Sequence, residues 1–302
     1  MNPPAKFFPN LLRALSATFA ATLLVFLTSL SIAEDKPEAA KESPWKRVVM
    51  IGASVTSGFV ASEPLGGTNT EMHRLSRYVE AALIAPHDPV KNLGSPFLFL
   101  QPEIVGPQQI EQALKEKPTL IIGVDFLFWF CYGAGKTDAD RLLRFEKGLK
   151  LLEKFDCPLI IGDIPDASAA VNGILRPDQM PNAEAMAAAN KRLKEWMAGR
   201  KGAIVPLSQF MRDGVANREI KIGSDTVPEG KSRALLQKDK LHPTPSGCSV
   251  IALGILEAFQ STRQGDFSKD FRHDAQEIYR LGVNGGKVAS SAVAKPNAPS
   301  AK

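Results

Sequence analysis

The sequence predicts an α/β fold, a three-layer α/β/α sandwich with a central parallel sheet. Short apolar runs alternate with longer amphipathic runs along most of the 302-residue chain, and parallel neighbours in a sheet need such crossover helices between them. Hydrophobic residues make up 44% of the chain and charged residues 23%, which is typical of a globular protein and not of a disordered one. A chain of this length can bury one large core.

Four brief, β-branched runs bounded by Gly or Pro are predicted to be buried strands. They are Arg47–Ile51, Thr119–Val124, Pro158–Ile161 and Ala203–Pro206, and a weaker strand is predicted at Pro89–Asn92. The spacing of apolar residues predicts helices between the strands. These are Glu71–Ala85, Pro107–Lys117, Asp138–Phe155, Asn182–Ala198 and Ser246–Phe259. In such a sheet a ligand site lies at the carboxyl ends of the strands.

Residues 1–33 have the pattern of a signal peptide. Lys6 and Arg13 precede an apolar run, and the small residues Ser31 and Ala33 flank Ile32 before a cleavage site at Glu34. This order of basic, apolar and small residues predicts a secreted or periplasmic protein with no stable membrane insertion after cleavage. An uncleaved membrane anchor is the alternative, because the apolar run approaches the length needed to span a bilayer.

The rest of the chain is predicted to comprise a polar linker at 34–44, one domain at 45–283 and a disordered tail at 284–302 that is rich in Gly, Ser, Ala and Pro. The formal net charge is only +5 and no dense basic run contains aromatic residues, so no nucleic-acid partner is predicted.

The three cysteines show no metal-ligand spacing. For Cys131, Cys157 and Cys248 we expect buried free thiols, with one disulfide and one free thiol as the alternative. No metal or organic cofactor is predicted.

Two short segments could carry chemistry. Gly52-Ala53-Ser54 directly follows the first strand, and Asp239 stands three residues before His242 in the loop before the last core helix. A serine hydroxyl becomes a good nucleophile when a histidine takes its proton, and a carboxylate can hold that histidine in the right tautomer. The alternatives are that Ser54 only caps a helix and that His242 is solvated in a helix-entry turn.

Together, these segments resemble the SGNH (GDSL) hydrolase family over about residues 46–262. The resemblance implies the flavodoxin-like fold of that family and a Ser54–His242–Asp239 triad that hydrolyses carboxylic esters through an acyl-enzyme intermediate. It also implies an oxyanion hole made by the backbone amides of Ser54 and Gly94, where Asn92-Leu93-Gly94 matches the family's second block. The substrate would be a small-molecule or polysaccharide ester, and no cofactor is implied.

The sequence departs from the family pattern at two positions. Ala53 replaces the Asp of the family's GDS turn, and that Asp is not a member of the family's triad. Asp125, in Gly123-Val124-Asp125, stands where the family has an oxyanion-binding Asn. An ionised Asp125 would repel the developing negative charge, so it is expected to be protonated, to turn aside, or to slow the enzyme.

The second departure motivates an alternative function, that of a non-catalytic or weakly active binding protein for carbohydrate or another ligand. Acyl transfer to a sugar uses the same triad and is a third possibility. After Asp125, an aromatic run extends from Phe126 to Tyr132. It is predicted to pack in the core beneath a loop, and some of its side chains are expected to line the cleft or a partner surface.

Overall fold

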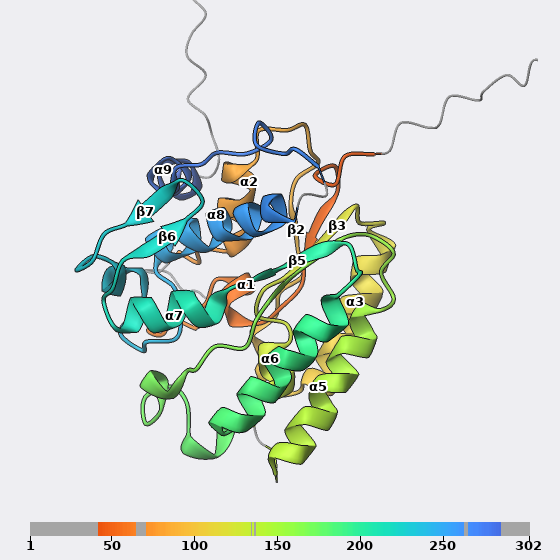
Figure 1. The fold of residues 1–302 in the computed structure, drawn as a ribbon, viewed down its shortest axis with the longest axis vertical. Helices are drawn as coiled ribbons and strands as arrows, with labels where there is room; N and C mark the ends of the chain where they lie inside the picture. Colours follow the sequence, from red (N-terminus) through yellow and green to blue (C-terminus); the bar gives the residue numbers. More distant parts are fainter. Residues whose placement is uncertain (1–41, 65–70, 134, 136, 263–264, 285–302) are drawn as a thin grey trace, which may run out of the picture. The chain divides into compact units, whose positions relative to one another are not determined.

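The computed structural model describes residues 42–64, 71–133, 135, 137–262 and 265–284. Within them, five parallel strands form one sheet in the order β2-β1-β3-β4-β5 (Figure 1). The strands are β1 Val48–Met50, β2 Lys91–Asn92, β3 Leu120–Gly123, β4 Leu159–Gly162 and β5 Gly202–Val205. All five lie within the predicted strands or differ from them by one residue at an end. For β1, β3, β4 and β5 the local signal is a short apolar run between turn residues.

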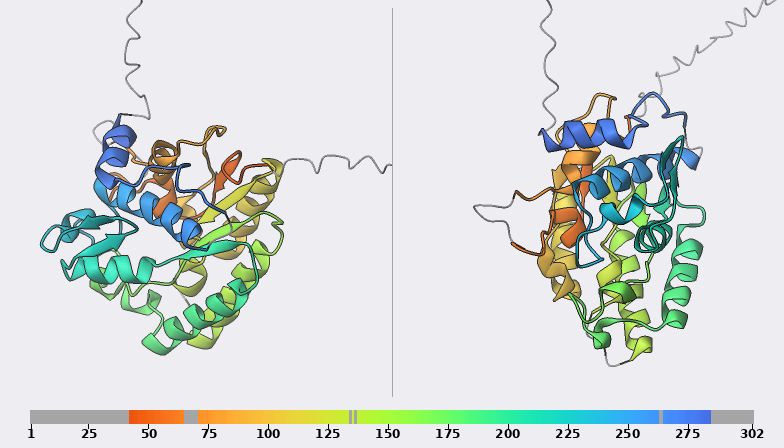
Figure 2. Two further views of the ribbon diagram at one scale, coloured as in Figure 1. Left: turned by 45° about the horizontal axis from the view of Figure 1, so that its top comes forward. Right: turned by 90° about the vertical axis from the view of Figure 1, so that its left-hand side faces the viewer.

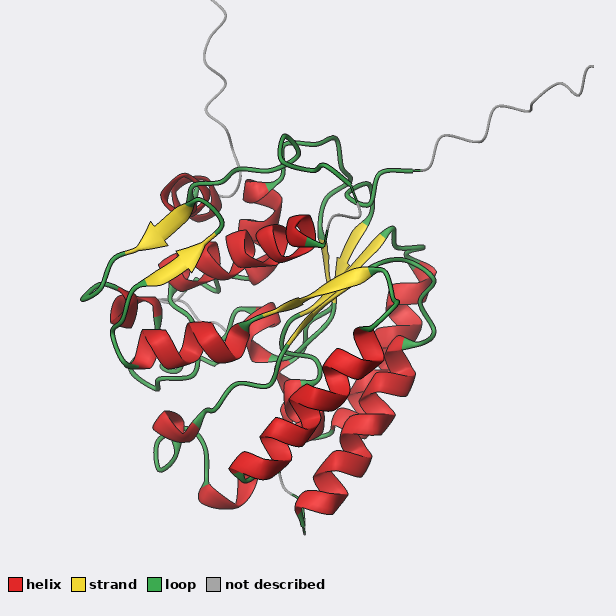
Figure 3. Ribbon diagram, in the orientation of Figure 1, coloured by secondary structure: helices red, strands yellow, loops and turns green. Residues whose placement is uncertain are grey.

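Helices cover both faces of the sheet, which confirms the predicted three-layer architecture (Figures 1 and 3). One face packs against α3 Pro102–Lys115, α5 Asp138–Leu152 and α6 Ala183–Met197. The other face packs against α2 Leu75–Ala82 and α8 Pro245–Ser261, with α9 Ala275–Val283 beside them. Alternate strand residues divide between the two cores: Val49 faces the first and Val48 the second, as the two-residue period of a strand requires.

Four elements between β5 and the last core helix were not predicted (Figure 2). They are α7 Leu207–Val215, the antiparallel pair β6 Ile220–Ile222 and β7 Asp225–Val227, and the 3-10 turn η4 Ser232–Leu235. The helix α9, near the end of the domain, was not predicted either. The remaining short elements are α1 Ser54–Ser57, α4 Phe128–Cys131, η1 Pro96–Phe99, η2 Ser168–Ala170 and η3 Pro177–Gln179.

Two predicted helix starts were wrong. α3 begins at Pro102 and continues through Pro107; the sequence offered two prolines at possible first-turn positions, and the earlier one starts the helix. α2 begins at Leu75 instead of Glu71, because the backbone of Arg74 is extended and the helix starts after it.

The aromatic run from Phe126 to Tyr132 is buried throughout, so the prediction of core packing is confirmed. The predicted segments 1–33 and 285–302, and most of the linker, lie outside the described residues. Among the residues that the structure does describe, no helix is long and apolar enough to cross a membrane.

Candidate active site

Ser54 is the first residue of α1 and follows β1 through a tight turn at the carboxyl edge of the sheet. Gly52 in this turn has φ +151°, and a Cβ there would lie 2.0 Å from Asp125 Oδ1. The buried Gln109 side chain of α3 holds the same residue in both directions: Gly52 N–H donates to Oε1 at 3.1 Å, and Nε2 donates to the Gly52 carbonyl at 2.8 Å. The turn that carries Ser54 is therefore fixed by the helix beside it.

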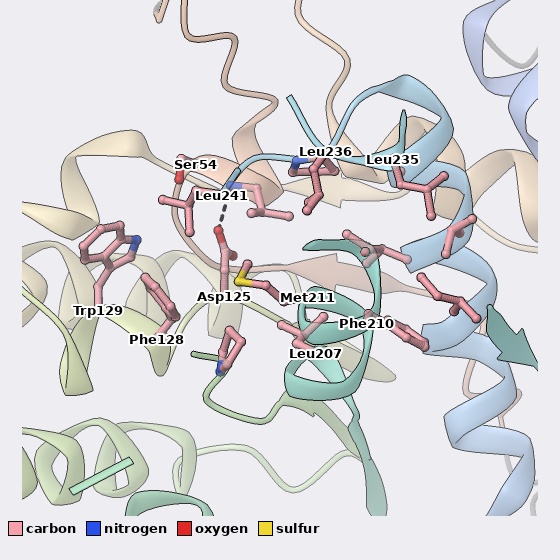
Figure 4. Close-up of a pocket in the computed structure, with 18 residues that line it drawn as sticks. Ser54, Asp125, Phe128, Trp129, Leu207, Phe210, Met211, Leu235, Leu236 and Leu241 are labelled. Carbon is pink, nitrogen blue, oxygen red and sulfur yellow. Dashed lines mark hydrogen bonds between the residues drawn. The ribbon is translucent and has the colours of Figure 1, made fainter. Parts of the chain in front are cut away.

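Asp125 caps the helix that begins at Ser54. The residue in the N-cap position of α1, Ala53, has no side-chain acceptor. Asp125, which follows β3, instead accepts the N–H of Val55 at 2.8 Å and of Thr56 at 3.3 Å through Oδ2 (Figure 4). Its Oδ1 accepts the Thr56 hydroxyl at 2.6 Å. A carboxylate in this position satisfies helix-end donors and interacts well with the helix dipole.

Asp125 is only 4% exposed. Burial raises the pKa of this carboxyl above its ordinary value, although hydrogen bonds from Thr56 and the neighbouring backbone amides act in the opposite direction. Both carboxyl oxygens are turned toward α1. Asp125 is therefore already engaged in positioning the turn that carries Ser54.

The structure brings Ser54, His242 and Asp239 together in one chain of hydrogen bonds. Ser54 Oγ lies 2.9 Å from His242 Nε2, and His242 Nδ1 lies 2.8 Å from Asp239 Oδ2. Ser54 is 7% exposed and His242 3% exposed, so the contact is shielded from bulk water. This order of hydroxyl, imidazole and carboxylate is the arrangement that activates a serine.

The loop around His242 is held in place by local contacts. Asp239 Oδ1 accepts the backbone N–H of Leu241 and of His242, each at 3.0 Å. Phe59 stacks on the imidazole with ring centroids 4.1 Å apart. Burial alone would raise the pKa of Asp239, but the hydrogen bond and charge of His242 and these amides hold it below the ordinary value. Asp239 is therefore ionised at neutral pH, as an orienting partner must be.

The predicted Gly94 donor is placed differently. Its N–H donates to Asn92 Oδ1 at 2.9 Å, so this amide is already engaged within the loop. The Asn92 side chain in turn donates to the carbonyl of Thr56 at 2.8 Å, which ties the loop to α1. A role for the Gly94 amide stays a prediction from the family resemblance.

A large apolar pocket opens beside Ser54 (Figure 4). It encloses about 770 Å³ of empty space, counting the part that is open to solvent. Its walls come from α7, η4, α8, β6 and the aromatic run. A smaller pocket of about 270 Å³ also reaches Ser54 and is lined by Phe59, His73 and Gln237 among others.

Sequence reasoning missed Gln109, Thr56 and Phe59, which hold the turn and the imidazole. Gln109 had a readable signal, since it is a polar residue in the apolar stripe of a helix whose neighbours Gly106, Ile110 and Ala113 are buried. Thr56 and Phe59 had none, because their partners lie far along the chain.

Within the described residues, no group of three or more His, Cys, Asp or Glu side chains could hold a metal ion. The three cysteines are free; Cys131 and Cys248 are buried as predicted, whereas Cys157 is only half-buried. Burial raises the pKa of the Cys131 and Cys248 thiols to about 12.

No family model and no curated protein matches the sequence. Solved structures similar to the chain include a lipase/acylhydrolase from Enterococcus faecalis, with 16% identity, a TM-score of 0.48 and coverage of 76% of this chain and 98% of that one. An acetylxylan esterase from Geobacillus stearothermophilus has 15% identity, a TM-score of 0.42 and coverage of 71% and 94%. A gut microbial diltiazem-metabolizing enzyme has 13% identity, a TM-score of 0.46 and coverage of 71% and 46%.

Proposed function

We propose that this protein is a serine esterase that hydrolyses carboxylic esters through an acyl-enzyme intermediate. The observation that carries the proposal is the continuous hydrogen-bonded chain from Ser54 Oγ through His242 to Asp239, at the edge of an apolar pocket that Ser54 itself lines. These three hydrogen-bonded side chains lie at the carboxyl ends of parallel strands, where this class of fold binds ligands.

In the first half of the reaction, Ser54 Oγ attacks the ester carbonyl carbon while His242 Nε2 takes the hydroxyl proton. The tetrahedral intermediate collapses, the bond to the alcohol oxygen breaks, and His242 returns the proton to that oxygen. Asp239 accepts the Nδ1–H of His242, which fixes the tautomer and stabilises the imidazolium. The backbone N–H of Ser54, at the start of α1, supports the proposed oxyanion hole.

In the second half, a water molecule attacks the acyl carbon and gives a proton to His242. The bond to Ser54 breaks, the carboxylic acid leaves, and the hydroxyl recovers its proton. Asp125 also supports this proposal. Both of its carboxyl oxygens accept hydrogen bonds from α1, so the carboxyl acts as a cap for the helix that begins at Ser54.

A fluorophosphonate probe tests the proposal, because it labels only an activated serine. We expect labelling of the wild-type protein at neutral pH and none of Ser54→Ala. Ser57→Ala is the matched control, since Ser57 lies in the same short helix, is also buried, and has a hydroxyl that donates to the Ser54 carbonyl at 3.3 Å. Absence of labelling in a folded wild-type protein would favour the non-catalytic binding function.

Export is a separate part of the proposal and is supported only by the pattern in residues 1–33. Mass spectrometry of the protein from the producing cell should give a mature chain that begins at Glu34. A chain that still carries the apolar run would support the membrane-anchored alternative.

A further inference from the structure

We propose that the apolar pocket beside Ser54 binds the acyl chain of the ester, so that the preferred substrates carry hydrophobic acyl groups longer than acetyl. This inference rests on the proposed function. It chooses between the small-molecule and polysaccharide esters that the sequence left open, in favour of a small-molecule ester with a hydrophobic acyl group.

The lining of the pocket carries the inference. Side chains with polar atoms are limited, among the described lining residues, to Ser54, Asp125 and Trp129. The Asp125 oxygens are turned toward α1. The rest of the lining is apolar side chains and glycine, with Leu207, Phe210 and Met211 from α7, and Val250 and Ile251 from α8.

Such a surface favours a hydrocarbon chain over a sugar. A sugar placed here would leave most of its hydroxyl groups without hydrogen-bond partners, which costs free energy for every buried group. An acyl chain needs no such partners and gains from each methylene that leaves water. Because Ser54 lies in the lining, a chain in the pocket can be continuous with a carbonyl at the hydroxyl.

A chain-length series tests the inference with the whole protein. For p-nitrophenyl esters from acetyl to octanoyl, we expect kcat/KM to rise by about fourfold per methylene until the pocket is filled. A flat or falling series, with Ser54 still labelled by fluorophosphonate, would overturn the acyl-pocket inference and leave the esterase proposal intact.

A blocking variant locates the effect. Met211→Trp places a larger side chain in the pocket, and we expect the octanoyl-to-acetyl ratio of kcat/KM to fall at least about tenfold. Arg212→Trp makes the same replacement at an exposed position next to it on α7 and should leave the ratio unchanged. An unchanged ratio in folded Met211→Trp would place the acyl chain elsewhere.

A binding measurement separates this inference from the chemistry. Calorimetry with Ser54→Ala protein should show tighter binding of ethyl octanoate than of ethyl acetate, and the difference should shrink when Met211→Trp is added. Equal, weak binding of both esters would overturn the inference even if the wild-type enzyme proves active.

A second inference rests on a different observation, the indole N–H of Trp129. Its side chain is only 5% exposed, and an aromatic cluster fixes the ring, with Phe128 at 4.8 Å and Phe99 at 5.3 Å between centroids. No hydrogen bond joins the indole nitrogen to another described residue. The nitrogen is not among the fully buried atoms that lack a partner, so it keeps some exposure, and Trp129 lines the pocket. Figure 4 shows the nitrogen on the ring edge that faces the other labelled residues.

We infer that this N–H donates to the carbonyl oxygen of the bound ester and to the oxyanion that forms from it. A buried indole N–H usually has a partner, and the ligand would supply the one that the protein does not. Trp129 would then replace the donor that is lost where Asp125 stands in the family's Asn position, which makes it a catalytic residue of the proposed reaction.

Trp129→Phe tests the role, because it removes the donor and keeps an aromatic ring. We expect kcat to fall about 10²–10³-fold with little change in KM, and the affinity for an alkylboronic acid, which mimics the tetrahedral intermediate, to fall in parallel. Trp196→Phe is the control, since Trp196 lies on α6 and its indole donates to Glu153 at 3.1 Å. Unchanged kcat in Trp129→Phe, or a fall in kcat without loss of boronate affinity, would overturn the inference.

Discussion

The carboxylate of Asp125 holds the helix that begins at Ser54, so its removal should cost both stability and, in the proposed reaction, turnover. In Asp125→Ala, the N–H groups of Val55 and Thr56 and the Thr56 hydroxyl lose their acceptor. Water can reach part of Val55, which is half-buried, whereas Thr56 is buried. An unsatisfied buried polar group costs about 1–3 kcal/mol, so the two groups of Thr56 predict a loss of about 2–6 kcal/mol in the free energy of unfolding.

This loss predicts a melting temperature lower by about 5–15 °C. Denaturant unfolding followed by tryptophan fluorescence would measure the free energy directly. Since a small displacement of a reacting group can cost about 10²-fold in rate, kcat should fall by a similar factor. An Asp125→Ala protein that melts and turns over like the wild type would refute the capping role.

Asp125→Asn is the informative companion. Its side-chain oxygen can still accept the two backbone N–H groups, and its NH₂ can donate to the Thr56 hydroxyl, so stability should stay near wild type. The pKa of Asp125 is raised in the folded state; the unfolded chain therefore loses its proton first, and the contribution of Asp125 to stability falls as pH rises through the folded pKa. The stability of Asp125→Asn relative to wild type should accordingly increase from acid to neutral pH.

Two further predictions concern the turn and the triad. Gly52→Ala should destabilise the protein by more than about 1 kcal/mol and slow fluorophosphonate labelling, because its Cβ would lie 2.5 Å from Thr56 Oγ1 as well as against Asp125; Gly214→Ala, whose Cβ would make ordinary contacts, is the control for melting temperature. Asp239→Asn should lower kcat by about 10³–10⁴-fold in ester assays. Because the folded pKa of Asp239 is lowered, its contribution to stability is present above the unfolded pKa and is lost as pH falls through the folded pKa. Acid titrations of wild type and Asp239→Asn should therefore converge at low pH, and parallel curves would contradict this assignment.

The sequence predicted the features that depend on residues close together in the chain, such as the core strands and the positions of Ser54 and His242. Four of the five core strands are short apolar runs, and Ser54 and His242 stand at positions that a strand end and a helix start identify. The β6–β7 pair was not predicted, although it has a local signal, because Ile220 and Ile222 alternate with Lys221 before a glycine turn.

Other features depend on partners that are distant in sequence. The helix α7 follows Pro206, and its first turn is held by Asp163 at the end of β4: Ser208 N–H donates to Asp163 Oδ1 at 2.7 Å across 45 positions. The engagement of Asp125 with α1 spans 70 positions at Val55. Neither contact has a local signal in the sequence. The hydrogen bonds from α1 to Asp125 could therefore not be predicted from the sequence.

The two carboxylates, Asp125 and Asp163, have a common consequence for how the site is built. Each stands at the end of one strand and satisfies the start of the helix that follows a neighbouring strand. A helix as short as α1 cannot persist alone in water, so the segment that bears Ser54 takes shape only once β3 has docked beside β1. The conformation of the segment around Ser54 therefore depends on the pairing of β1 with β3. Loss of that pairing would also remove the cap that Asp125 provides to α1.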